Sequence, residues 1–171
     1  MRVCIYAGAS NKIEQKYILF VEKLGENLAE KGCSLVYGGG GSGLMGAAAR
    51  GFRKGGADVI GVIPTFMDKF EPVFEDCTEI IRTTDMSERK NVMEEKADMF
   101  IIVPGGIGTF DELFQILTLK ELERHNKRIV IYNIDGYYTK LLECLKDFVK
   151  KGFVRESIHN YFEVVNVNTL M

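Results

Sequence analysis

The sequence predicts an α/β protein: a Rossmann-like three-layer sandwich in which a mostly parallel sheet has helices on both faces. Short apolar runs, typical of buried strands, alternate along the chain with longer stretches of helical periodicity. Glycine-rich turns follow several of the strand-like runs and precede helix-like ones. The 171 residues suffice for one domain with a proper core, so we expect residues 1–171 to form a single domain.

The expected elements follow from these patterns in chain order. The first strand, 2–6, leads to a helix over 15–31 that has apolar residues on one face and stops at Gly32. The other expected strands are 34–37, 58–63, 79–82, 99–103, 128–132 and 162–167, and the other helices are 44–54, 86–97, 110–124 and 138–151. Segment 65–78 reads as irregular but is rich in apolar residues, so we expect it to line a pocket or meet a partner.

Composition and charge restrict the classes of partner. The formal net charge is −2 and no basic block is present, so nucleic acid is not an expected partner. No apolar run reaches the length of a membrane span, and the start of the chain lacks the layout of a signal peptide, so we expect a cytoplasmic protein without a membrane partner. Four scattered cysteines read as reduced thiols, and His125 and His159 read as isolated surface residues, so no metal is expected.

The first glycine-rich turn runs from residue 38 to residue 46. Gly41, Gly43 and Gly46 match the spacing of a dinucleotide-binding turn, but the next strand ends without the acid that would hold the ribose. This argues against a nicotinamide cofactor, and we expect no cofactor. The alternative is a tight turn with close helix packing, which explains Gly46 but not four consecutive glycines; those predict a close approach of a ligand to the backbone.

The second glycine-rich turn, 104–108, is followed by two carboxylates, Asp111 and Glu112. A turn between a strand and a helix presents N–H groups to an anion, whereas a pure phosphate cradle gains nothing from adjacent acids. A site that also performs chemistry accounts for them. The competing interpretation is local: Thr109 and Glu112 fit a capping box, and Asp111 in the first turn suits the helix dipole.

Two cations follow an expected N-cap at Asp85, which has Glu88 three residues later. Arg89 and Lys90 lie on or beside the apolar stripe of helix 86–97. Either they extend their charged ends to solvent, or they point into the cleft at the carboxyl end of the sheet. In the cleft they would neutralise a phosphate close to the two acids.

Three motifs together resemble the Lonely Guy family, the cytokinin riboside 5′-monophosphate phosphoribohydrolases, whose members are often labelled as lysine decarboxylase-like. The motifs are Tyr37-Gly-Gly-Gly-x-x-Gly-Leu-Met-Gly46, Asp85-Met-x-x-Arg-Lys90 and Pro104-Gly-Gly-x-Gly-Thr-x-x-Glu112, and the resemblance runs from residue 2 to about 153. Asp111 replaces a glutamate that is common in the family and keeps its charge. Nothing in the chain resembles a pyridoxal-phosphate lysine site, so a decarboxylase is not expected.

The resemblance implies hydrolysis of the N-glycosidic bond of a nucleoside monophosphate, which gives a free base and ribose 5-phosphate. It implies a catalytic pair, Arg89 and Glu112, and a phosphate site at Gly105, Gly106, Gly108 and Thr109. The further substrate contacts that it implies are Ser10, Gly39, Gly40, Gly43, Glu71, Lys90, Ile107, Phe110, Asp111 and Thr118. Cleavage of a ribosyl bond passes through an oxocarbenium-like cation, which a carboxylate stabilises while it acts as nucleophile or activates water.

Two features of the sequence have more than one interpretation. Helix 110–124 is apolar around most of its circumference, so it is either a central helix of the monomer or, as the resemblance implies, part of a homodimer interface. The activity also has alternatives: a non-catalytic carrier of a nucleotide or of the molybdenum cofactor on the same fold, or a general purine-monophosphate nucleosidase in salvage. Arg89 and Glu112 favour an enzyme, because a binding protein has no need of them.

Overall fold

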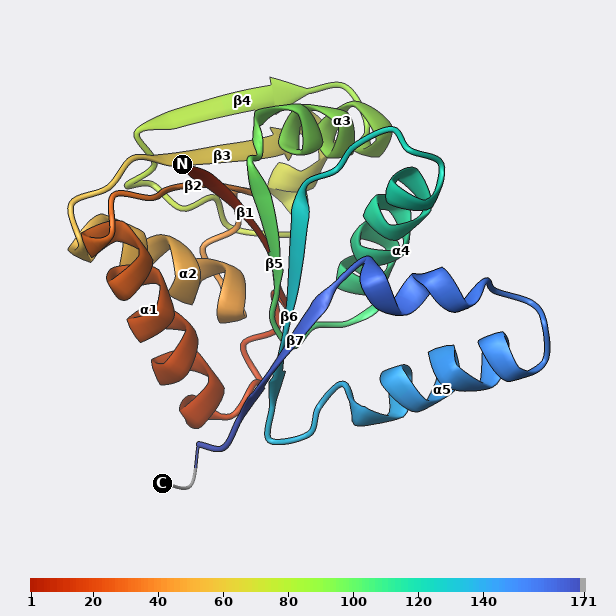
Figure 1. The fold of residues 1–171 in the computed structure, drawn as a ribbon. Coiled ribbons are helices and arrows are strands. Elements are labelled where there is room, and N and C mark those ends of the chain that lie inside the picture. The colour runs from red at the N-terminus through yellow and green to blue at the C-terminus, as the bar shows by residue number, and fades with distance from the viewer. Residues whose placement is uncertain (170–171) are drawn as a thin grey trace.

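The computed structural model describes residues 1–169 and shows a seven-stranded sheet between two layers of helices (Figure 1). The strands are β1 (Arg2–Tyr6), β2 (Ser34–Tyr37), β3 (Val59–Pro64), β4 (Glu79–Thr83), β5 (Met99–Ile102), β6 (Arg128–Ile134) and β7 (Glu163–Val167). The α-helices are α1 (Gln15–Glu30), α2 (Gly43–Lys54), α3 (Met86–Lys96), α4 (Ile107–Glu121) and α5 (Thr139–Lys150), with short 3₁₀ helices η1 (Thr65–Lys69) and η2 (Glu156–Asn160). Every pairing between these strands is parallel, so the predicted α/β class is confirmed.

The strand order is β4-β3-β2-β1-β5-β6-β7. Successive strands are added on one side of β1 as far as β4, and on the other side of β1 from β5 onward. The chain moves outward from β1 to β4, returns through α3 to β5 beside β1, and then moves outward the other way. Helices α1 and α2 cover one face, and α3, α4 and α5 cover the other (Figure 1). The turns after β1 and β5 therefore diverge to opposite faces, and such a point leaves a crevice at the carboxyl ends of the strands.

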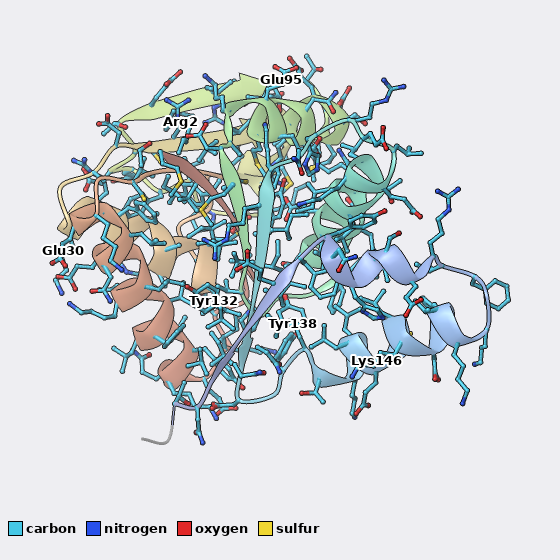
Figure 2. The ribbon with its side chains drawn as sticks, in the orientation of Figure 1. Arg2, Glu30, Glu95, Tyr132, Tyr138 and Lys146 are labelled. Carbon is cyan, nitrogen blue, oxygen red and sulfur yellow. The ribbon has the colours of Figure 1, made fainter. Side chains whose placement is uncertain are left out.

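The core has one apolar layer on each face of the sheet. In β1, Val3 and Ile5 pack toward α1 and α2, whereas Cys4 and Tyr6 pack toward α3 and α4. Because both faces are covered, the central strands are continuous apolar runs without polar alternation. Figure 2 shows Tyr138 in the interior, while Glu30, Glu95 and Lys146 project from the outer helices.

Helix α4 begins three residues earlier than the sequence predicts. Its N-cap is Gly106, in an extended conformation (φ −94°, ψ −152°), and no side chain caps it. The capping-box interpretation is therefore wrong, because Thr109 lies inside the helix. Asp111 and Glu112 belong to the second turn of α4, so neither is an acidic residue in the first turn that would interact with the helix dipole. The predicted cap of α3 is confirmed: Asp85 Oδ1 accepts a hydrogen bond of 2.9 Å from the N–H of Glu88.

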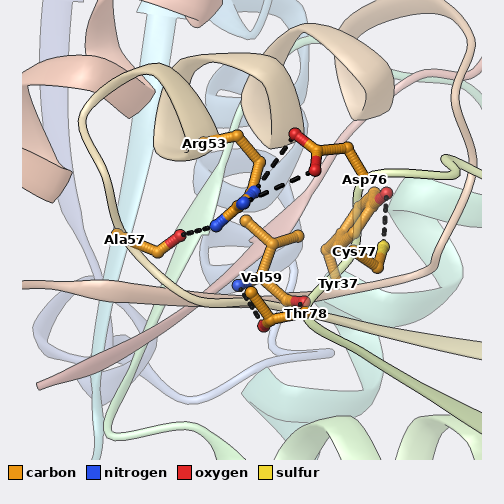
Figure 3. Close-up of polar contacts among 7 residues, drawn as sticks. All are labelled: Tyr37, Arg53, Ala57, Val59, Asp76, Cys77 and Thr78. Atoms are coloured by element: carbon orange, nitrogen blue, oxygen red, sulfur yellow. Dashed lines mark hydrogen bonds and ion pairs between the residues drawn. The ribbon is translucent and has the colours of Figure 1, made fainter.

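Segment 65–78 is more ordered than expected. It begins with η1, and its end is fixed by side-chain contacts with α2, β2 and β3 (Figure 3). Arg53 forms an ion pair with Asp76, and the Thr78 hydroxyl accepts from the Val59 N–H at 2.9 Å. Across residues 1–169, no helix has both the length and the apolar character needed to cross a bilayer.

Candidate functional site

A cavity of about 820 Å³ opens at the carboxyl ends of the strands. Its walls come from the turns after β1, β3, β5 and β6 and from the first turns of α2, α3 and α4. This volume lies in the range of small-molecule sites, and the cavity occupies the crevice that the strand order creates. The predicted site residues that line it are Ser10, Glu71, Arg89, Gly105, Gly106, Gly108, Thr109 and Glu112.

The two glycine-rich turns differ in whether their helix N-terminus is free. At α2 the N–H groups of Leu44 and Met45 both bond to the carbonyl of Gly8, at 2.8 and 3.3 Å. The dinucleotide interpretation of the first turn therefore fails, because these donors are already used. At α4 no side chain caps the helix, and Gly106, Gly108 and Thr109 line the cavity. The first N–H groups of a helix lack acceptors within it, so α4 presents a site for an anion.

Arg89 is buried, with 6% of its surface exposed, and its side chain lies in the cleft. Its Nε donates to the carbonyl of Val62 at 3.1 Å, and its Nη2 donates to the carbonyl of Gly38 at 2.8 Å. Two backbone acceptors, one directly after β2 and one within β3, thus fix the planar guanidinium. The prediction that Arg89 points into the cleft is therefore confirmed, and the alternative, that its charged end extends to solvent, is wrong.

The run of glycines makes room for functional side chains. A Cβ on Gly38 would overlap Arg89 Nη2, and a Cβ on Gly40 would overlap Glu71 Oε1. Gly39 has φ +80°, and its carbonyl accepts from the N–H of Phe74, while Gly40 forms a bridge with segment 65–78. The close approach that four glycines predict is therefore an approach to the protein's own side chains. Direct contact of Gly39, Gly40 or Gly43 with substrate stays a prediction, because these residues do not line the cavity.

Glu112 is the carboxylate with the most perturbed acidity in the cavity. Burial raises its pKa to about 7, and the positive charge of Arg89 opposes this rise. Glu71 shows the same balance: burial raises its pKa, and Arg89 lowers it. Its Oε1 is buried and has no hydrogen-bond partner in the described chain. One fixed cation therefore lies near two partly dehydrated carboxylates, an arrangement that is common at catalytic sites.

The remaining predicted contacts lie outside the cavity of a single chain. Lys90 does not line the cavity and instead forms an ion pair with Asp111 at 3.0 Å. Of the two adjacent cations of α3, only Arg89 therefore lies in the cleft. Thr118 lies on α4, where its hydroxyl donates to the carbonyl of Phe114. Ile107 is exposed at the start of α4, and Phe110 packs partly against the core.

Several cavity residues escaped the sequence interpretation. Gly8 and Ala9 follow β1, Tyr137 follows β6, and Lys12 precedes α1. The sequence places each of them after an expected strand, which is where ligands bind in such folds. Only the order of strands in the sheet shows that these particular turns meet at one cavity. Met67 confirms that segment 65–78 lines a pocket.

The outer face of α4 is not fully covered by the other described residues of the chain. Leu113, Ile116 and Leu117 are buried, whereas Phe114 and Leu122 are exposed. The interpretation of α4 as a central helix of the monomer is therefore wrong, because the helix lies in an outer layer (Figure 1).

The fold and the cavity define a Rossmann-like α/β protein whose candidate site lies where the strand order changes direction at the centre of the sheet. The family model described as "Possible lysine decarboxylase" matches residues 45–170. A cytokinin riboside 5′-monophosphate phosphoribohydrolase from Arabidopsis thaliana is 39% identical over 90% of this chain and 70% of its own length. A probable enzyme of the same name from Oryza sativa subsp. japonica is also 39% identical over 90% of this chain.

The chain therefore belongs to the family described as "Possible lysine decarboxylase", which includes these phosphoribohydrolases. This confirms the resemblance to the Lonely Guy family that the sequence motifs indicate. The chain spans 62% of the length of that rice relative and 64% of a second one.

Solved structures confirm the fold. The molybdenum cofactor carrier protein of Chlamydomonas reinhardtii has a TM-score of 0.72 at 21% identity and covers 96% of this chain and 88% of its own. The molybdenum cofactor binding protein of Rippkaea orientalis has a TM-score of 0.68 at 21% identity and covers 96% of this chain and 86% of its own. At this identity the likeness extends to the fold alone, so it does not favour a carrier.

Proposed function

We propose that this protein hydrolyses the N-glycosidic bond of adenosine 5′-monophosphates, N6-modified ones included, and releases the free base and ribose 5-phosphate. The observation that carries the proposal is the position of Glu112 beside Arg89, one helical turn from the free N-terminus of α4. The curated relatives, named for this activity on cytokinin riboside 5′-monophosphates, support it. We propose that residues 1–171 act as one domain in the cytoplasm.

In this proposal the 5′-phosphate binds to the N–H groups at the start of α4. Gly105, Gly106, Gly108 and Thr109 surround that position in the cavity. Anchoring the phosphate holds the ribose at a fixed distance from Glu112, which restricts the reacting atoms to a productive arrangement. The base then extends toward Glu71, whose buried and unpartnered oxygen is suited to accept a hydrogen bond from an amino group of the purine.

The bond between C1′ and the purine nitrogen breaks with its electron pair moving to the base. Positive charge then develops on the ribose, and the ionised carboxylate of Glu112 stabilises it. A water molecule adds its oxygen to C1′, one of its protons passes to a basic group, and the departing base gains a proton. Arg89 holds a fixed positive charge that keeps a fraction of Glu112 ionised near neutral pH.

A second part of the proposal is a homodimer through α4. Phe114 is exposed on this helix and Leu122 is exposed directly after it, and the rings of Phe110 and Phe114 stack with their centroids 6.4 Å apart. Apolar side chains gathered on an outer helix are typical of protein interfaces. Lys90, Asp111 and Thr118 lie on α3 and α4 outside the cavity, so their predicted substrate contacts belong with the assembled form.

The deciding experiment measures base release from AMP and from isopentenyladenosine 5′-monophosphate by chromatography. We expect both to be cleaved, with the higher kcat/KM for the prenylated substrate. Glu112→Gln should keep the fold and lower kcat by about 10²-fold or more. Equal kcat/KM values would point to general purine salvage, and absence of release from both nucleotides would overturn the hydrolase proposal.

A further inference from the structure

Four consecutive carbonyl groups around the second glycine turn each have a hydrogen-bond donor. The carbonyl of Val103 accepts from the Tyr138 hydroxyl at 2.8 Å, and that of Pro104 accepts from the Gly8 N–H at 3.0 Å. The carbonyl of Gly105 accepts from the Tyr137 hydroxyl at 2.6 Å, and that of Gly106 accepts from the N–H of Phe110 within α4. None of these oxygens is left to repel an anion.

A fixed carbonyl also fixes the N–H on the other side of the same peptide. The trans peptide is planar, so its C=O and N–H point in opposite directions. The carbonyl of Gly105 shares a peptide with the N–H of Gly106, the N-cap of α4, and both glycines line the cavity. A peptide between two glycines has little steric resistance to rotation. Its orientation therefore depends on the bond from Tyr137.

We propose that Tyr137 is a positioning residue: its hydroxyl holds the Gly105–Gly106 peptide so that the start of α4 offers donors, and no carbonyl oxygen, to a phosphate monoester. The inference rests on the proposed function in placing that phosphate at α4. The Tyr137 ring is itself held, edge-on against Tyr138 at 5.0 Å, and it forms part of the cavity wall.

Tyr138 provides a matched control. Its hydroxyl also bonds to a carbonyl of this turn, but the peptide that follows Val103 ends in Pro104, which has no N–H. Its orientation therefore presents no donor to a ligand. Tyr138 is fully buried, whereas Tyr137 is 45% exposed. Removing the Tyr138 hydroxyl should lower stability, and removing the Tyr137 hydroxyl should lower affinity.

The test measures the Kd of ribose 5-phosphate by calorimetry for wild type, Tyr137→Phe and Tyr138→Phe, together with thermal unfolding. Tyr137→Phe should weaken binding about three- to tenfold, as expected for one hydrogen bond, with little change in Tm. Tyr138→Phe should lower Tm and leave the Kd within about twofold of wild type. In turnover of AMP, Tyr137→Phe should raise KM by a larger factor than it lowers kcat, because the bond from Tyr137 acts on phosphate binding while Glu112 and Arg89 keep their positions.

A rescue experiment distinguishes peptide orientation from loss of a contact. Rotation of the Gly105–Gly106 peptide would move φ of Gly106 from −94° into the positive region, which alanine resists. Apart from Gly106 itself and its two chain neighbours, no heavy atom of residues 1–169 lies within 4 Å of a Cβ built at Gly106. In a Gly106→Ala background, Tyr137→Phe should therefore change the Kd less than twofold from that of Gly106→Ala alone.

An equal loss in both backgrounds would overturn the inference, as would an unchanged Kd in Tyr137→Phe or no binding of ribose 5-phosphate by wild type. Binding that depends on Tyr137, in a protein that releases no base from any nucleotide, would instead overturn the hydrolase proposal and leave this inference in place.

Discussion

The acidity of Glu112 results from two opposed effects, burial and the charge of Arg89. Burial dominates, so the folded protein holds a proton on this carboxyl up to a pH of about 7, whereas the ordinary value is 4.5. The folded state therefore binds more protons than the unfolded chain between these values. The contribution of Glu112 to stability is most favourable below pH 4.5 and is lost as the pH rises through 7.

Glu112→Gln should accordingly stabilise the protein in a pH-dependent way. The amide carries no charge to bury, so the variant should match wild type near pH 4.5 and be more stable at pH 8, by at most about 3 kcal/mol. Thermal unfolding of both proteins across this range measures the difference. A difference in Tm that stays constant with pH would contradict the assignment of the raised pKa to Glu112.

The space around Gly40 and Gly41 in the first glycine-rich turn gives a second prediction for individual residues. Gly40→Ala places a Cβ against Glu71 Oε1, whereas a Cβ on Gly41 meets only ordinary contacts at 3.4 Å or more. Gly40→Ala should displace Glu71 and raise KM for AMP about tenfold, with a smaller effect on kcat. Gly41→Ala, the matched control in the same run, should behave as wild type. Equal kinetics for the two variants would show that the approach of Gly40 to Glu71 has no functional role.

At the scale of elements, α4 combines two functions on one helix. Its start faces the cavity, one side packs on the sheet, and its outer side carries exposed apolar residues. The early start of the helix at Ile107 makes this possible, because it places Glu112 in the second turn, above the free N–H groups.

The proposed homodimer gives the prediction for this element. Wild type should sediment as a dimer at micromolar concentration, and Phe114→Glu should shift it to monomer, since a charge would be buried in the interface. Phe153→Glu is the control: Phe153 is 81% exposed and follows α5, so its replacement should leave the dimer intact. A monomeric wild type would contradict the proposal.

The sequence predicted most elements because both faces of this sheet are covered, which gives the strands strong apolar signals. It failed at the start of α4, where Thr109 and Glu112 imitate a capping box while Gly106, without a side chain, takes the cap position. It found Arg89 and Glu112 through motifs, but it missed Tyr137, Gly8 and Lys12. Their place in the cavity depends on which strands are neighbours in the sheet, and local sequence patterns do not determine that order.

At the scale of the molecule, the cavity joins turns that lie far apart in the chain. Gly8 follows β1 and Gly105 follows β5, and the two turns are bonded through the Gly8 N–H and the Pro104 carbonyl. A ligand in the cavity contacts both halves of the sheet, so binding should stabilise the fold as a whole.

AMP should therefore raise the Tm in proportion to the logarithm of its concentration, with about 2.7 kcal/mol of stabilisation at 100 times its Kd. Glu112→Gln, which should slow turnover by about 10²-fold or more, is the suitable protein for this measurement. Adenosine should give a smaller shift, because it lacks the phosphate that α4 is proposed to bind. Equal shifts from AMP and adenosine would contradict a phosphate site at α4.

The guanidinium of Arg89 has a consequence for how the chain selects one alignment of its strands. Of its two acceptors, the carbonyl of Gly38 directly follows β2 and that of Val62 lies within the neighbouring strand β3. A slip of β3 by one residue would turn its side chains to the opposite face and carry the Val62 carbonyl away from this cation. A buried charge without acceptors is too costly to retain, so misaligned sheets are penalised. Arg89, the residue proposed for catalysis, thus also favours the native alignment of β3 over misaligned ones.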